Sequence, residues 1–186
     1  MVFKIFEEKE NLSIPGTNLL TRPLARQFIP WLSSSLAKCA ASFEFAEFSF
    51  ERVDTADTSF LDELLIVNGL EAMKHRKIGR TPISLSHLSA STFDNARSVF
   101  GNKKIPVVCW KGREDFELLG HLENKLARTL RHVMTHRECT AVELARKEGI
   151  AINTASTRLS KLYKLSIVSR REEISEKGRE YIYYAG

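Results

Sequence analysis

One stretch near the C-terminus places hydroxyl and basic side chains at helical spacing. Between Ala151 and Tyr163, the apolar residues Ala155, Leu159 and Leu162 recur every three or four positions, which predicts a helix with one narrow apolar stripe. The opposite face of this helix carries two hydroxyls and two cations: Thr154, Thr157, Arg158 and Lys161. Such side chains can hydrogen-bond base edges and neutralise phosphates. The pattern therefore predicts a helix that enters the major groove of DNA.

The start of this helix is expected at Asn153, because an asparagine side chain can accept a backbone N–H of the first turn. Taken alone, residues 151–163 are better explained as an ordinary amphipathic surface helix. The neighbouring segments decide between the two interpretations.

The residues before this stretch predict two further helices. Apolar residues at helical spacing over about 122–137 indicate the first helix. Thr140 and Glu143 form a capping-box pattern that opens a short second helix over 141–148, and Gly149 ends it. Helix, short helix, glycine turn and helix is the order of a helix-turn-helix.

The residues after it predict a strand over 166–173, then a return strand from Ile174 followed by a final helix. Only two to four residues would separate Arg171 from Ile174, so the β-wing is expected to be very short. The segments LYKLSIVSRRE and ISEKGREY resemble the winged-helix repressors of the MarR-like group.

That resemblance implies a set of DNA contacts in this chain. Base edges or phosphates would be contacted by Asn153, Thr154, Ser156, Thr157, Arg158 and Lys161, with Arg158 able to read a guanine. The DNA backbone would be contacted by Arg170, Arg171, Lys177 and Arg179. Winged-helix repressors usually dimerise, and the apolar segment 181–184 offers a contact for a homodimer, or it packs internally.

The net charge of +5 is unevenly distributed along the chain. Residues 121–186 hold 13 Lys and Arg against 8 Asp and Glu, whereas residues 1–120 hold 15 of each. All the excess positive charge therefore lies in the C-terminal third. This asymmetry favours a polyanion-binding module joined to a neutral domain.

The first 120 residues alternate between strand and helix patterns. Strands are expected at 2–6, 43–53 (with a bulge near 46–47), 82–86, 105–110 and 116–119, the last two as a possible hairpin. Helices are expected from Thr21 (kinked or restarted at Pro30), from about 57 to 74, and over 92–100 before Gly101, with a polar turn over 7–16. This alternation predicts a small α/β domain over residues 1–119, followed by a mainly α winged helix-turn-helix domain over 120–186.

A second chemical possibility lies where the strand ending near Val53 meets its helix. Asp57, Thr58 and Ser59 are all suited to capping that helix. The segment Asp54 to Leu64, with Leu20-Thr21-Arg22 and the Phe-rich strand, resembles the STAS-like domain family labelled DUF4325. That family is related to anti-sigma-factor antagonists, and the resemblance implies a regulatory phosphorylation at Thr58 or Ser59. Phe60 replaces the small residue usual after the hydroxyls, and plain helix capping explains these residues as well.

Other chemistry finds little support. His132, His136 and Cys139 have a spacing that could present zinc ligands, but no fourth ligand is evident, so no metal or cofactor is predicted. No phosphate-binding glycine loop, nucleophile elbow or Cys-x-x-Cys pair is present, and we expect no enzyme. Three widely spaced cysteines and the lack of an apolar run of membrane length favour a cytoplasmic protein.

These observations predict a bacterial or phage-type transcription regulator that binds double-stranded DNA. Its STAS-like domain would receive a signal or a protein partner. The alternative is a partner-switching adaptor that binds a kinase or ATPase through that domain, and a weaker option is a subunit encoded in a defence or mobile-element operon.

Overall fold

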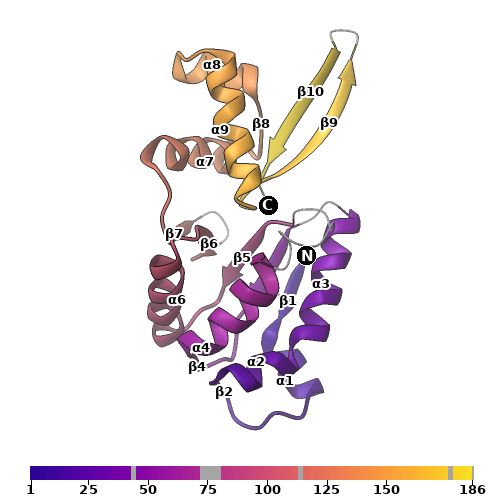
Figure 1. Ribbon diagram of the computed structural model, residues 1–186, viewed down its shortest axis with the longest axis vertical. Coiled ribbons are helices and arrows are strands. Elements are labelled where there is room, and N and C mark those ends of the chain that lie inside the picture. The colour runs from indigo at the N-terminus through magenta and orange to yellow at the C-terminus, as the bar shows by residue number, and fades with distance from the viewer. Residues whose placement is uncertain (43–44, 72–80, 113–114, 176–177, 186) are drawn as a thin grey trace. The chain divides into compact units, whose positions relative to one another are not determined.

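The computed structural model describes residues 1–42, 45–71, 81–112, 115–175 and 178–185 (Figure 1). The chain divides into two compact units, Met1–His121 and Leu122–Gly186. Each unit has its own architecture. The protein is mixed α/β, and no helix of the described part is long and apolar enough to cross a lipid bilayer.

The first unit is built on a five-stranded sheet with the order β1-β3-β5-β6-β7. Its strands are β1 (Val2–Lys4), β3 (Ala46–Ser49), β5 (Ile83–Ser86), β6 (Val107–Trp110) and β7 (Phe116–Leu119). The first four run parallel, and β7 returns antiparallel to β6, which confirms the expected hairpin. Strands of parallel sheets are mostly buried, and all four residues of β5 are buried here.

Helices occupy the connections between these strands. They are α1 (Ile5–Asn11), α2 (Arg22–Gln27), α3 (Ile29–Ser42), α4 (Thr58–Leu61), the π-helix η1 (Asp62–Glu71) and α6 (Ala90–Lys103). A separate parallel pair, β2 (Asn18–Leu19) and β4 (Thr55–Ala56), links two of the connections. The helices α3 and η1 pack together, as do α4 and α6. The predicted restart at Pro30 is confirmed, because α2 ends at Gln27 and α3 begins at Ile29.

The core of this unit is rich in phenylalanine. Phe28, Phe48 and Phe60 are fully buried, and the rings of Phe28 and Phe60 meet edge to face with centroids 5.4 Å apart. Full burial of one such side chain contributes roughly 1.5–3 kcal/mol. The ring of Trp31, in α3, contacts both Phe28 and Phe48, so the cluster links the C-terminal end of α2 with α3, β3 and α4.

Several boundaries differ from the sequence expectation. The predicted turn over 7–16 is wrong, since residues 5–11 form α1, whose Ile5 and Phe6 are buried. The predicted strand over 43–53 is reduced to Ala46–Ser49, and residues 43–44 lie outside the described part. Gly101 does not end its helix, because α6 continues to Lys103 and stops where Lys104 adopts a left-handed conformation. The predicted helix end near Lys74 also lies outside the described residues.

The second unit contains three helices and a small antiparallel sheet. The helices are α7 (Asn124–His136), α8 (Ala141–Glu148) and α9 (Ile152–Lys164). The sheet has the order β8-β10-β9, with β8 (Glu138–Thr140), β9 (Ser169–Ser175) and β10 (Gly178–Tyr184). Figure 1 shows β9 and β10 as a long two-stranded hairpin.

Both ends of α8 follow the sequence expectation. The Glu143 N–H donates to the Thr140 hydroxyl at 3.2 Å, and the Thr140 N–H donates to the Glu143 carboxylate at 2.8 Å. This capping box opens α8 as predicted. Gly149, at a φ of 63°, closes the helix in the left-handed conformation that glycine tolerates best.

The last residues of the chain form a structure that differs from the sequence expectation. Neither a very short wing nor a final helix is present in the described residues, because β9 continues through Ser175 and β10 occupies 178–184. The physical reason is the alternation of the final segment: Tyr183 and Ala185 are buried, and Tyr183 pairs with Cys139 of β8. The backbone N–H and C=O groups of β10 form their hydrogen bonds with β8 and β9, so these residues do not need a helix to satisfy them.

Candidate nucleic-acid interface

Helix α9 presents the polar face that its sequence predicts. Ala155, Leu159 and Leu162 are each 0% exposed and hold the helix against the rest of its unit. The outward residues Asn153, Thr154, Ser156, Thr157 and Lys161 are exposed. The helix is therefore fixed by one stripe and free to contact a ligand with the other.

Asn153 does not cap this helix. Ala151 is the N-cap residue and has extended backbone angles, and no side chain caps the start. Because the glycine turn ends at Ala151, Asn153 already lies in the first helical turn. Its carbonyl accepts a hydrogen bond from the Thr157 hydroxyl at 2.8 Å, and its side chain remains exposed.

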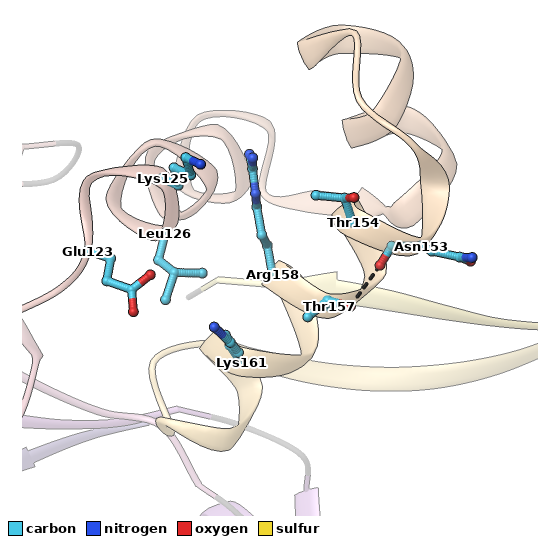
Figure 2. Close-up of a pocket in the computed structure, with 8 residues that line it drawn as sticks. All are labelled: Glu123, Lys125, Leu126, Asn153, Thr154, Thr157, Arg158 and Lys161. Carbon is cyan, nitrogen blue, oxygen red and sulfur yellow. Dashed lines mark hydrogen bonds between the residues drawn. The ribbon is translucent and has the colours of Figure 1, made fainter.

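A groove of about 370 Å³ runs between the outward face of α9 and the start of α7. Its walls are Glu123, Lys125, Leu126, Asn153, Thr154, Thr157, Arg158 and Lys161. Figure 2 shows Glu123 and Leu126 on one wall and Lys161 on the other. Five of the residues expected to bind DNA therefore line one groove, whereas Ser156 is not among its lining residues.

Lys125 belongs to this groove although it was not predicted as a site residue. It is exposed in the first turn of α7 and forms no ion pair with any described residue. Lys161 also forms no ion pair within the described part of the chain. The positive charge of Lys125 could have been found in the sequence, but its position opposite α9 depends on the packing of α7 against α9.

Arg158 has a different environment from the one its sequence position suggests. Its guanidinium donates to the Glu148 carboxylate at 2.5 Å, and only 15% and 11% of the two side chains are exposed. The pair ties α9 to the end of α8. Arg158 lines the groove, but its charge is already balanced by Glu148.

The two arginines at the start of the β9–β10 hairpin are also engaged. The Arg170 guanidinium lies 4.3 Å from the ring centroids of both Tyr163 and Tyr181, which is cation–π distance. Arg171 donates two hydrogen bonds to the Glu138 carboxylate, at 2.6 and 2.9 Å. The pairing raises the pKa of Arg171 and lowers that of Glu138 through the same hydrogen bonds.

The rest of the hairpin is close to neutral. Arg179 pairs with Glu172, and Arg171 makes a second ion pair with Glu173. Ile174 is 81% exposed in the same strand. Lys177, the remaining basic residue predicted here, lies outside the described residues. Among the described residues, Arg171 pairs with the carboxylates of Glu138 and Glu173, whereas Arg170 contacts only tyrosine rings. Contact of these two arginines with phosphate stays a prediction.

In the first unit, Asp57 is the capping residue of α4. Its carboxylate accepts hydrogen bonds from the Phe60 N–H at 2.7 Å and the Thr21 N–H at 3.1 Å. Thr58 is exposed and Ser59 is half-buried in the first turn of the helix. Of the three competing residues, the aspartate therefore caps, and the two hydroxyls are left for other contacts.

A buried acidic pair, Asp62 and Glu63, opens η1. Asp62 and Glu63 are 6% exposed each and face Arg22, Arg26 and Lys103. The hydrogen bond from Arg26 lowers the pKa of Glu63 despite the opposing effect of burial. The pairing of residues some forty positions apart could not be seen in the sequence.

The three candidate zinc ligands do not assemble into one site. The thiol of Cys139 is buried and donates to the Thr140 carbonyl at 3.3 Å, and burial raises its pKa to about 11. Among the residues that the structure describes, no three His, Cys, Asp or Glu side chains form a group that could hold a metal ion. His132 and His136 do lie together, with ring centroids 4.2 Å apart.

Comparison with models of protein families, with curated proteins and with solved structures finds no match to this chain.

Proposed function

We propose that the second unit is a winged helix-turn-helix that binds double-stranded DNA, with α9 as the recognition helix. The observation that carries this proposal is the face of α9, where exposed hydroxyls and Lys161 line a groove that Lys125 completes from α7. A helix with this distribution can place hydroxyls at base edges while cations neutralise flanking phosphates.

The charges suggest how the contacts divide between the elements. Lys125 and Lys161 are exposed and have no acidic partner in the described part of the chain, so they are ready to neutralise phosphate. Arg171 and Arg179 are paired with glutamates of the same sheet. We therefore assign phosphate contact to α9 and the start of α7, and a smaller role to the hairpin than winged-helix proteins usually give it.

The proposal is tested by measuring binding to random duplex DNA over a range of salt concentrations. Each phosphate contact contributes about 0.9 to the slope of log K against log salt. Lys161→Ala and Lys125→Ala should each reduce the slope by about 0.9. Arg179→Ala, on the hairpin, is the matched comparison and should reduce the slope less than either lysine substitution. Absent or salt-insensitive binding to duplex would overturn the proposal.

The exposed hydroxyl of Thr58 favours a second candidate function, a partner-switching adaptor. A phosphate on Thr58 would add negative charge beside Asp57, at the start of α4. Such a charge would disturb the hydrogen bond from the Thr21 N–H to Asp57 and so change the surface formed by α2 and α4. Mass spectrometry after incubation with a cell extract and ATP tests it, with Thr58→Val as control. Phosphate found elsewhere only, or nowhere, would remove this candidate.

A further inference from the structure

A second groove of the C-terminal unit lies beside the His132–His136 pair. It has a volume of about 460 Å³ and is lined by His132, His136, Glu138, Thr140, Glu143 and Ile182. These residues come from α7, β8, α8 and β10. The groove is distinct from the candidate DNA interface, with which it shares no lining residue.

The two histidines stand four residues apart on α7, so both imidazoles project from one face of the helix. Their ring centroids are 4.2 Å apart and their planes meet at 39°. A pair of histidines at this spacing on a helix can chelate one ion of a late transition metal. Imidazole nitrogen is a preferred ligand for zinc, nickel and copper.

A hydrogen bond fixes the tautomer of His136. Its Nδ1 lies 2.9 Å from the carbonyl oxygen of His132. A carbonyl can only accept, so Nδ1 carries the proton and Nε2 of the neutral ring keeps its lone pair. Metal-binding histidines are usually oriented in this way, with one nitrogen donating to a carbonyl and the other facing the metal.

The surroundings also suit a cation. The carboxylates of Glu138 and Glu143 line the same groove. Both are held by other contacts, to Arg171 and to the Thr140 N–H, and so contribute charge more than direct ligation.

We propose that His132 and His136 form a two-histidine site for a divalent late transition-metal ion at the groove between α7 and α8, with water filling the remaining coordination positions. The site does not depend on the DNA-binding proposal, because it is formed entirely by other residues.

Calorimetric titration of the untagged full-length protein with Ni²⁺, in the absence of DNA, tests the site. We expect one ion per chain, bound more than about tenfold more weakly by His132→Gln and by His136→Gln, since even loss of a partner that merely orients a ligand costs about 10–100-fold. His121→Gln, an exposed histidine of the other unit, is the matched control and should bind as the parent does.

The electron paramagnetic resonance spectrum of bound Cu²⁺ gives a second readout. It should show nitrogen coupling from two imidazoles in the parent protein and from one in each single variant. Circular dichroism in the tyrosine region should match among all variants, which separates lost ligands from lost folding. Parent and double-variant proteins that bind Ni²⁺ equally, or a Cu²⁺ spectrum that is unchanged by both substitutions, would overturn the proposal.

Discussion

Replacing Glu148 by leucine should leave the Arg158 guanidinium without a partner in a largely buried position. Only 15% of the Arg158 side chain and 11% of the Glu148 side chain are exposed. Exposed ion pairs contribute about 0.2–1 kcal/mol, whereas removing one member of a fully buried pair costs about 3–5 kcal/mol. With this degree of exposure we expect Glu148→Leu and Arg158→Met each to destabilise the second unit by about 2–3 kcal/mol.

The double variant should behave differently from either single one. Two apolar side chains of similar size leave no unpaired charge at the contact between α8 and α9. Replacing a whole buried pair in this way is often neutral, so we expect the double variant to recover to within about 1 kcal/mol of the parent. The double variant would then be more stable than the sum of the two single effects predicts. Such a coupling energy would show that the two side chains act together in positioning α9.

The two units can be observed separately by spectroscopy. Both tryptophans, Trp31 and Trp110, lie in the first unit, and all four tyrosines lie in the second. Circular dichroism in the tyrosine region should therefore report the unfolding of the second unit. In each single variant we expect its melting temperature to fall by roughly 10–20 °C. Tryptophan fluorescence should report an unchanged transition of the first unit.

The reasoning fails if both single variants melt within about 2 °C of the parent, which corresponds to well under 1 kcal/mol for a unit of this size. Lys161→Ala is the matched control, because it removes an exposed cation from the same helix without breaking an ion pair. It should alter DNA binding and leave the melting temperature unchanged.

Three further predictions concern other parts of the molecule. Gly120→Ala should destabilise the first unit by about 3 kcal/mol, since the added Cβ would lie 2.0 Å from the Ile105 carbonyl oxygen; a tryptophan unfolding curve superimposable on the parent's would contradict this. Glu63 has a lowered pKa in the folded protein, so the stability that it contributes is present above its ordinary value of 4.5 and is lost as the pH falls through the folded pKa. The free energy of unfolding, measured with urea, should fall less steeply below pH 4.5 in Glu63→Gln than in the parent. An equal slope in both proteins would refute the stabilising role of the ionised Glu63. Cys109 and Cys139, whose pKa burial raises to about 11, should resist iodoacetamide near neutral pH until urea unfolds the chain, as mass spectrometry would show.

The sequence predicted elements best where the signal is local. The capping box of Thr140 and Glu143, the turn at Gly149 and the restart at Pro30 depend on residues within a few positions of one another, and all three are confirmed. The apolar stripe of α9 is confirmed for the same reason. The prediction of a final helix was wrong because the last segment pairs with β8 and β9, and β8 is distant in the chain.

For the candidate site, helical periodicity was enough to place the polar side chains on one face of α9. Which of the basic side chains in the second unit are already paired with a carboxylate depends on residues that are distant in the chain. Arg158 and Arg171 are balanced by Glu148 and Glu138, residues 10 and 33 positions away in the chain, while Lys125 is brought to the groove by the packing of α7. Charge is a property of the residue, but its availability depends on the partners that the fold places within hydrogen-bond distance.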